Sequence, residues 1–361
     1  MTAFVTGFPG FLGSALVERL VAERPARDVT CLVQARHRDL AERRAAAIED
    51  DHGAPGSVTL VEGDVVAPDL GLGDRYDELQ ATTETAYHLA AVYDLGVEAD
   101  VAARVNVRGT EHVLDFVGGA PELDRLHHVS TCYVSGRYDG VFGPADLLCG
   151  QRFNNHYEAT KFQAEVAVRR AMAGGLPATV YRPGVVVGDS ETGATQKFDG
   201  PYQFVRFLLA QPSLAVLPTV GDPMATEFNV VPRDFVVDAI DALRCRPETA
   251  GETYQLANPD PPTVAAVIDL VAAALDRRVV RVGVSRWALK GALARVPRLA
   301  SLSGIQPALV DYLDLPTRYD AQKTVAALDG SGVRCPRFAD YVDPLVDYVR
   351  AHPDADIGAL R

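Results

Sequence analysis

The chain has 361 residues, of which 48% are hydrophobic, and its formal net charge at pH 7 is −13. This length and apolar content provide a buried core and exclude global disorder. The negative charge argues against nonspecific nucleic-acid binding, which requires a basic surface. No apolar run approaches the roughly 18 residues of a membrane-spanning helix, and no signal-peptide pattern opens the chain.

The cysteines lie far apart in the sequence and form no C-x-x-C pair. Their spacing is typical of reduced thiols rather than of a disulfide framework or a zinc site. We therefore expect a cytoplasmic protein without a bound metal. The five residues are Cys31, Cys132, Cys149, Cys245 and Cys335.

The first residues change from a strand pattern to a helix pattern across a glycine-rich turn. Phe4 and Val5 begin a short apolar run, and leucines then recur at helical spacing. Glycines in such a turn let backbone N–H groups approach a pyrophosphate and let the helix pack closely on the strand. We expect the turn to bind the phosphates of a dinucleotide through Gly7, Gly10, Phe11, Leu12 and Gly13.

A second strand, residues 28–33, is expected to end beside the adenosine ribose. NAD enzymes typically place an acidic residue there, whereas a nearby arginine suits the 2′-phosphate of NADP. Gln34 stands in the place of the acid and Arg36 follows, so the sequence favours NADP, with Arg36 on the phosphate. Alternatively, Arg36 and Arg38 merely solvate the next helix.

The third and fourth predicted strands also end in candidate cofactor contacts. Asp64, at the end of residues 58–65, either accepts a hydrogen bond from the adenine amino group or caps the next turn. The strand of residues 87–91 runs into Ala90 and Ala91, whose small side chains let the backbone lie against a cofactor. Gly109, inside the following helix, indicates close packing, because glycine is unfavourable there.

The fifth strand, residues 126–131, delivers Ser130 and Thr131 at its C-terminal end, where α/β sheets place their chemistry. Further on, Tyr157 and Lys161 are i,i+4 neighbours on one face of a helix. An ammonium group stabilises a nearby phenolate and so lowers the pKa of tyrosine from about 10. Taken alone, this spacing is also that of an ordinary surface pair.

The second half changes character after a sixth strand, residues 178–188, which Pro183 and Gly184 interrupt. The helix of residues 202–209, rich in Phe and Leu, either lines a substrate pocket or belongs to the core. Residues 227–234 are expected to form a strand that returns to the sheet. Residues 277–298 carry seven basic side chains and no acidic one. They could bind an anionic membrane surface or the phosphates of a CoA or carrier-protein substrate. Alternatively, they form a solvated surface whose charge is balanced by acidic residues elsewhere in the fold.

Six motifs, in this order, resemble those of the extended short-chain dehydrogenase/reductase family. They are T-G-x-x-G-x-x-G at 6–13, G-D-V at 63–65, H-L-A-A at 88–91, N-V-x-G-T at 106–110, Y-x-x-x-K at 157–161 and R-P-G at 182–184. The resemblance implies an α/β fold: a Rossmann-type doubly wound parallel sheet with a smaller, interleaved C-terminal substrate domain. We expect the NADP-binding domain in residues 1–188 plus 227–246, and the substrate-binding domain in residues 189–226 plus 247–361.

The same resemblance implies a catalytic set of Thr131, Tyr157 and Lys161, with Ser130 as the less fitting hydroxyl. Tyr157 would act on the reacting oxygen, and Lys161 would hold the nicotinamide ribose. Cys132 could be considered an acyl nucleophile, but a buried cysteine is usually a small hydrophobe. The remaining expected cofactor contacts are Tyr157 and Lys161 themselves, together with Asp64, Val65, Ala90, Ala91 and Pro183.

Within that family the chain is most similar to the fatty acyl-CoA reductase and thioester reductase branch. The similarity lies in the segment 32–36 and in the Ser130–Thr131 pair, and the chain lacks a sugar-nucleotide signature. That branch usually has arginine where Gln34 stands. The similarity implies a free-standing, NADPH-dependent reductase of acyl thioesters or derived aldehydes, presented on CoA or a carrier protein. It also leaves open peripheral membrane contact through 277–298, and the oligomeric state.

Three other functions remain as alternatives at this level. The first is an NAD(P)-dependent dehydrogenase of hydroxy/keto lipids or steroids, which would use the same catalytic residues. The second is a sugar-nucleotide epimerase or dehydratase, and the third is a non-enzymatic NADP sensor. Such sensors lack the tyrosine and lysine of the Y-x-x-x-K motif, which counts against the third.

Overall fold

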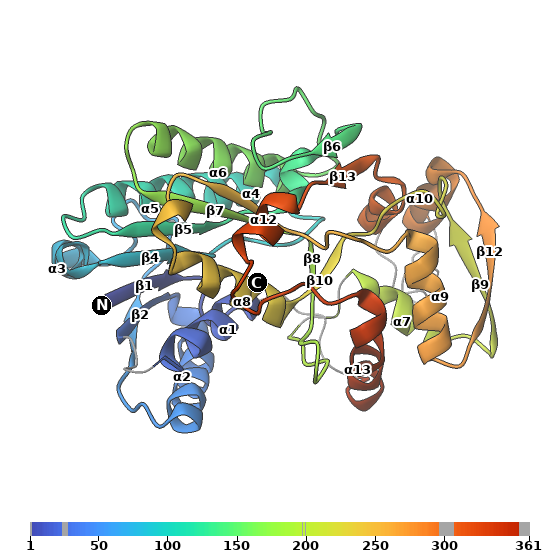
Figure 1. Cartoon of the computed structure of the whole chain (residues 1–361), viewed down its shortest axis with the longest axis horizontal. Helices are drawn as coiled ribbons and strands as arrows, with labels where there is room; N and C mark the ends of the chain where they lie inside the picture. Colours follow the sequence, from blue (N-terminus) through green and yellow to red (C-terminus); the bar gives the residue numbers. More distant parts are fainter. Residues whose placement is uncertain (1, 24–27, 197, 199, 296–306, 354–361) are drawn as a thin grey trace.

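The computed structural model describes residues 2–23, 28–196, 198, 200–295 and 307–353. Its centre is a seven-stranded parallel sheet with the order β11-β7-β5-β4-β1-β2-β3 (Figure 1). The strands are β1 (Thr2–Thr6), β2 (Asp28–Val33), β3 (Val58–Glu62), β4 (Thr85–His88), β5 (Arg125–Val129), β7 (Ala178–Pro183) and β11 (Thr253–Leu256).

Helices cover both faces of this sheet, as a doubly wound fold requires. Successive residues of a strand point to opposite faces, so Val5 packs with the helices of one face and Phe4 with those of the other. The first face carries α1 (Phe11–Val21), α2 (Arg38–His52) and α8 (Arg233–Arg244). The second carries α3 (Tyr76–Thr82) and α5 (Gly109–Gly118), and α6 (His156–Ala173) packs beside α5.

The chain leaves the central sheet at Gly184. The backbone N–H of Gly184 still donates to Leu256 on β11, but that of Val185 donates to the carbonyl of Asn229. A Cβ atom at residue 184 would lie 2.7 Å from that carbonyl oxygen. β8 (Val185–Val187) consequently pairs with β10 (Val230–Pro232) as a separate two-stranded sheet. The prediction that residues 227–234 return to the central sheet is therefore wrong.

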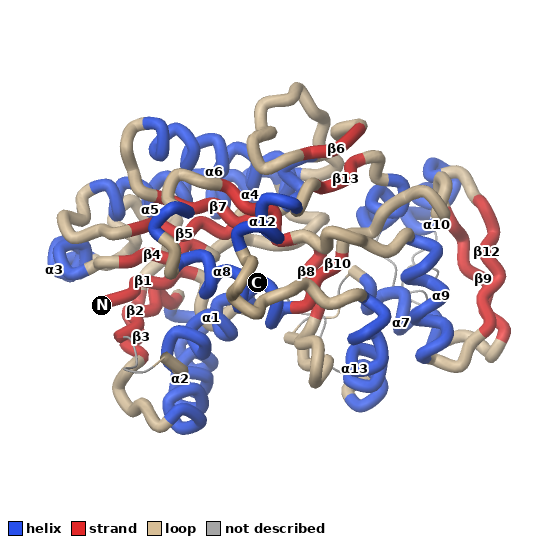
Figure 2. The backbone as a smooth tube through the Cα atoms, in the orientation of Figure 1, coloured by secondary structure: helices blue, strands red, loops and turns tan. Residues whose placement is uncertain are grey.

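A second region packs around its own hydrophobic core beyond β8 and β10. Figure 2 shows its helices gathered beside the ribbon of β9 and β12. Its elements are α7 (Pro201–Leu209), β9 (Leu214–Thr219), α9 (Val264–Ala274), β12 (Arg278–Gly283), α10 (Arg286–Arg295), η6 (Pro307–Asp314) and α13 (Phe338–Ala351). Among the described residues, no helix has both the length and the apolar character needed to cross a membrane.

Shorter elements complete the fold. β6 (Gly140–Phe142) pairs with β13 (Thr317–Tyr319). The others are η1 (Ala35–His37), η2 (Gly73–Arg75), α4 (Ala99–Ala102), the π-helical segment Ala103–Arg108, η4 (Cys132–Ser135), η5 (Pro247–Thr249) and α12 (Gln322–Ala327). β11 lies within residues 247–361, the range expected for the substrate domain, but it pairs with β7 in the central sheet. The NADP-binding domain as drawn from the sequence therefore lacks one strand of its sheet. The division into two domains stays a prediction.

Candidate active site

The turn between β1 and α1 is compact because three glycines lie in contact with backbone. Gly7 has φ +98°, and a Cβ atom there would lie 2.8 Å from the backbone nitrogen of Ala90. A Cβ at Gly10 would lie 2.6 Å from the Gly7 carbonyl oxygen, and one at Gly13 would meet the same oxygen even more closely. α1 has no side-chain cap, so its first N–H groups suit an anion. This cradle fits a dinucleotide pyrophosphate.

Two arginines converge on this turn from elements far away in the sequence. Arg44, on α2, donates to the carbonyl of Pro9. Arg233, the first residue of α8, has its guanidinium carbon 5.5 Å from the centre of the Phe11 ring, and its Nη2 lies 3.4 Å from Asp189 Oδ2. No local pattern pointed to either arginine, because their role depends on how α2 and α8 pack against α1.

The ends of β2 and β3 are joined by a chain of polar contacts. Arg36 Nε donates to Gln34 Oε1 (2.9 Å), and Gln34 Nε2 donates to Asp64 Oδ2 (2.7 Å). Asp64 Oδ1 accepts the N–H of Val66 (3.0 Å), so the capping interpretation of Asp64 is correct, and its adenine contact stays a prediction. Arg36 is exposed at the end of β2, while Arg38 pairs with Glu42 at 2.7 Å.

The histidine of the H-L-A-A motif, His88, forms hydrogen bonds with two buried threonines. His88 Nδ1 lies 2.8 Å from Thr6 Oγ1, and its Nε2 lies 2.9 Å from Thr110 Oγ1. Thr110 donates its proton to the Asn106 carbonyl, so it accepts from Nε2–H and leaves Nδ1 to accept from Thr6. Burial lowers the pKa of His88 to about 3. The neutral ring therefore ties β4 to β1 and α5, and Thr6 Oγ1 in turn accepts the N–H of Ala90 (3.2 Å).

The N-V-x-G-T motif serves close packing and the positioning of neighbouring segments. A Cβ atom at Gly109 would lie 2.9 Å from Val65 Cγ2, which confirms the packing inferred from that glycine. Asn106 Oδ1 accepts the N–H of Val92 (2.8 Å), and its Nδ2 donates to Thr160 Oγ1 (3.0 Å). Asn106 thereby holds the segment after Ala91 against α6.

The structure buries all three predicted catalytic residues. Their exposed fractions are 5% for Thr131, 6% for Tyr157 and 3% for Lys161. Lys161 Nζ donates to the carbonyl of Val129 (2.9 Å), the last residue of β5, which brings α6 to the strand end that Thr131 follows. Tyr157 packs edge-on against Tyr93, with ring centres 4.9 Å apart. An exposed Tyr–Lys pair is thereby excluded.

The start of α6 is determined by a side-chain cap. Asn155 Oδ1 accepts the N–H of Glu158 (3.0 Å), a typical N-cap contact that places Tyr157 in the first turn. The buried carboxyl of Glu158 also accepts from the hydroxyl of Tyr312, on η6, at 2.6 Å. Its pKa is raised, chiefly by burial. Because Glu158 and Tyr312 are far apart in the sequence, this link between the second region and α6 had no local signal.

The two neighbours of Thr131 have other partners. Ser130 Oγ donates to Glu165 Oε2 (2.6 Å). This contact is consistent with Ser130 being a less suitable catalytic hydroxyl than Thr131. Cys132 Sγ lies 3.1 Å from the carbonyl of Arg182 and 3.2 Å from Gln255 Oε1. Burial raises the pKa of the Cys132 thiol, which disfavours the thiolate that a nucleophile requires.

The Phe- and Leu-rich helix, α7, contributes mainly to the core. Phe204 and Leu208 are 4% and 1% exposed and pack with α9 and α13, while Phe207 and Leu209 are partly buried against the same cluster. The core interpretation therefore holds for Phe204 and Leu208. Of the four apolar residues considered for a substrate pocket, only Phe207 and Leu209 are not fully buried in this core.

The described part of the basic stretch 277–298 is partly balanced by acids elsewhere. Arg281 pairs with Asp269 at 2.8 Å, and Lys290 pairs with Asp311 at 2.6 Å. Residues 296–298 lie outside the described residues. These pairs favour the balanced-surface interpretation, and membrane contact through the stretch stays a prediction.

A parallel sheet with helices on both faces, a glycine turn after β1 and a buried Tyr157–Lys161 pair are the features expected of an extended short-chain dehydrogenase/reductase. More specifically, the chain belongs to the male sterility protein family, whose model matches residues 5–240. The predicted fold class and family are thus confirmed.

The chain is similar to both synthetase and reductase sequences. It is 29% identical over 269 residues to a linear gramicidin synthase of Brevibacillus parabrevis, covering 72% of this chain and 5% of that protein. It is 25% identical over 276 residues to a fatty acyl-CoA reductase of Drosophila melanogaster, covering 66% and 52%. The chain spans between 5% and 27% of the length of the first curated relatives.

The fold also resembles that of a solved R domain. The terminal R domain from the myxalamid PKS-NRPS biosynthetic pathway matches with a TM-score of 0.82 and 24% identity, covering 98% of this chain and 91% of that one. At this level of identity the likeness shows the shared fold.

Proposed function

We propose that the protein is an NADPH-dependent reductase of acyl thioesters or of the aldehydes derived from them. The observation that carries this proposal is the burial of Tyr157 and Lys161 on α6, where Lys161 contacts Val129 at the C-terminal end of β5, two residues before Thr131. The substrate class is supported by a relative named as a fatty acyl-CoA reductase. The thioester would be carried by CoA or by a carrier protein.

Each catalytic side chain has a separate task. When bound, the nicotinamide cofactor supplies the hydride. Tyr157 donates its proton at the substrate carbonyl oxygen, and the Thr131 hydroxyl donates a second hydrogen bond there. Lys161 holds the nicotinamide ribose and, through its charge, favours the phenolate form of Tyr157. With a thioester, the tetrahedral adduct expels the thiol and leaves an aldehyde, which a second reduction converts to an alcohol.

The substrate class is tested by following NADPH oxidation with acyl-CoAs of increasing length, the matching aldehydes, cyclic ketones and sugar nucleotides. Burial of a methylene contributes about 0.8 kcal/mol, so kcat/KM should rise by up to roughly fourfold per methylene until the site is full. If kcat/KM is flat with acyl length while a cyclic ketone turns over well, the thioester proposal is wrong and a hydroxy/keto dehydrogenase replaces it.

The cofactor preference is tested at Arg36. Arg36→Ala should weaken NADPH binding by about tenfold or more, because a phosphate loses its charged partner, and should leave NADH binding unchanged within about twofold. Arg38→Ala is the matched control, since Arg38 pairs with Glu42. Dissociation constants from cofactor fluorescence give the readout. Equal affinity of the native protein for NADPH and NADH would remove the proposed preference.

A further inference from the structure

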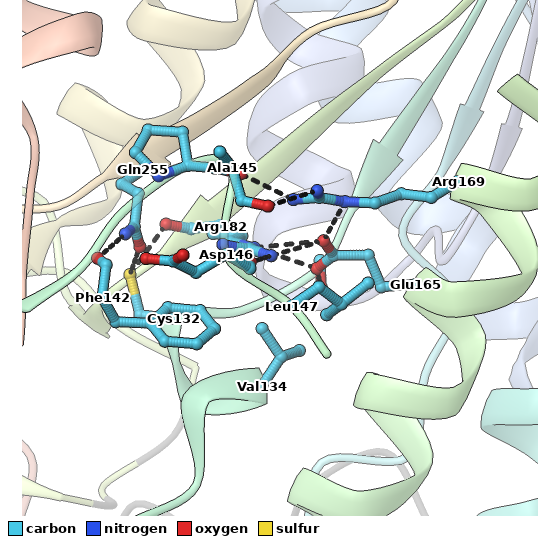
Figure 3. A network of polar contacts seen from close by, with 12 residues as sticks. Cys132, Val134, Phe142, Ala145, Asp146, Leu147, Glu165, Arg169, Arg182 and Gln255 are labelled. Carbon is cyan, nitrogen blue, oxygen red and sulfur yellow. Dashed lines mark hydrogen bonds and ion pairs between the residues drawn. The ribbon is translucent and has the colours of Figure 1, made fainter. Parts of the chain in front are cut away.

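A buried ion pair joins α6 to β7 and has no part in the chemistry described above. Glu165 and Arg182 are both fully buried, and Arg182 Nη2 lies 2.7 Å from Glu165 Oε1. Arg182 is the arginine of the R-P-G motif. Arg169 joins the pair, with its Nε 3.0 Å from the same carboxylate oxygen (Figure 3). Buried charges are costly unless they are paired and hydrogen-bonded, and this carboxylate meets that condition.

The Glu165 carboxylate lies where α6 contacts the C-terminal end of β5. Along α6, Tyr157, Lys161 and Glu165 follow one another at intervals of four residues and share one face. Lys161 donates to the carbonyl of Val129, and Glu165 accepts from the hydroxyl of Ser130 (2.6 Å). Consecutive residues at the end of β5 are therefore held by consecutive turns of α6, and Thr131 comes next in the chain.

The same ion pair also anchors the segment that follows β6. Arg182 donates to the carbonyls of Gly143 (3.2 Å) and Asp146 (2.6 Å). Arg169 donates to those of Pro144 (2.6 Å) and Ala145 (3.1 Å). Four successive carbonyls thus bind two guanidinium groups that converge on one carboxylate (Figure 3), so the carboxylate organises both arginines and the loop over them.

Glu165 also supplies negative charge to the catalytic lysine. Lys161 interacts electrostatically with His88 on β4, with His128 on β5 and with Glu165 on its own helix. Burial lowers the pKa of both histidines, so they are neutral at pH 7. Burial lowers the pKa of Lys161 to about 8, and the Glu165 carboxylate opposes that change.

We propose that Glu165 is a positioning residue for the catalytic set: its carboxylate fixes the Ser130–Thr131 turn relative to Tyr157 and Lys161. This inference rests on the proposed reductase function for its kinetic consequences. Its structural consequence, order in the turn of residues 130–136, holds with or without a substrate.

The test compares Glu165→Gln with Ser130→Ala. Glu165→Gln should lower kcat by about 10- to 100-fold through misplacement of Thr131. It should also move the alkaline limb of the kcat/KM profile about one pH unit lower, because Lys161 loses its proton more readily. Ser130→Ala removes one hydrogen bond but keeps the charge, so it should lower kcat by about tenfold or less and leave the alkaline limb in place.

The matched control is Asp241→Asn. Asp241, on α8, is likewise bound by two arginines, Arg19 (2.8 Å) and Arg244 (2.6 Å), but it belongs to a different cluster. Asp241→Asn should change thermal stability without changing the pH profile. If Glu165→Gln and Asp241→Asn lower activity to the same extent with unshifted profiles, Glu165 is only a structural residue and the inference is wrong.

Hydrogen exchange in the unliganded protein provides a readout that needs no substrate. Glu165→Gln should speed exchange of the amides of residues 130–136 by about tenfold or more, whereas Asp241→Asn should leave them unchanged. Native-like exchange in Glu165→Gln would overturn the inference. If the native protein reduces none of the tested thioesters or aldehydes, the proposed function fails, and exchange still decides the role of Glu165.

Discussion

Replacing Tyr157 with phenylalanine should lower kcat by about 10³-fold or more, because the variant lacks the hydroxyl proposed to donate a proton to the reacting oxygen. The ring remains, so its edge-on contact with Tyr93 and the fold should persist. Cofactor affinity should stay within about threefold of the native value, since the phenol is not a phosphate ligand. Steady-state rates with a confirmed substrate and cofactor titration measure the two effects.

The control for Tyr157→Phe is Tyr76→Phe, on α3, where the ring packs edge-on against Phe116. It removes a hydroxyl of the same kind from a different part of the fold and should leave kcat near the native value. A Tyr157→Phe variant with a near-native rate would show that the general acid is another residue.

The second large effect is expected at Gly13. An alanine Cβ there would run into the Gly7 carbonyl, which is backbone and cannot rotate away as a side chain would. Gly13→Ala should therefore push α1 away from the turn, raise the dissociation constant for NADPH by roughly 100-fold and destabilise the fold by about 1–3 kcal/mol. Cofactor titration and thermal unfolding provide the measurements.

Gly118→Ala is the matched control, because a Cβ at this helical glycine has no neighbour within 4 Å. It should leave cofactor binding unchanged and stabilise α5 slightly, by less than about 1 kcal/mol. If Gly13→Ala bound NADPH as tightly as Gly118→Ala does, the glycine turn would not be the phosphate site.

The parts of the site that could be predicted are those whose chemistry lies within one short segment. The glycines around Gly10 lie in a turn that follows a strand and precedes a helix, which is the pattern of a phosphate site. Tyr157 and Lys161 are four residues apart, so one turn of a helix places them on the same face. The burial of both residues and the contact of Lys161 with Val129 agree with that prediction. The assignment of the catalytic roles remains a proposal.

The parts that could not be predicted depend on packing between distant segments. Arg44 and Arg233 reach the glycine turn only because α2 and α8 pack beside α1. Tyr312 reaches Glu158 across more than 150 residues. The apolar pattern of α7 predicted a buried face correctly, but periodicity alone does not distinguish a core contact from a pocket wall. For Phe204 the structure shows a core contact.

The proposed reaction transfers hydride from NADPH to the acyl carbon of a thioester, with Tyr157 as the proton donor. The most direct test incubates the protein with a long-chain acyl-CoA and NADPH deuterated at the transferable C4 position, and analyses the product by mass spectrometry. We predict an aldehyde, or the alcohol formed from it, with deuterium on the former thioester carbon, and no such product from Tyr157→Phe. Acyl-CoA recovered unchanged from the native protein, with no deuterium in any aldehyde or alcohol, would contradict this reaction, and the contradiction would be complete if the same deuterated NADPH labelled the alcohol formed from a cyclic ketone in a parallel incubation.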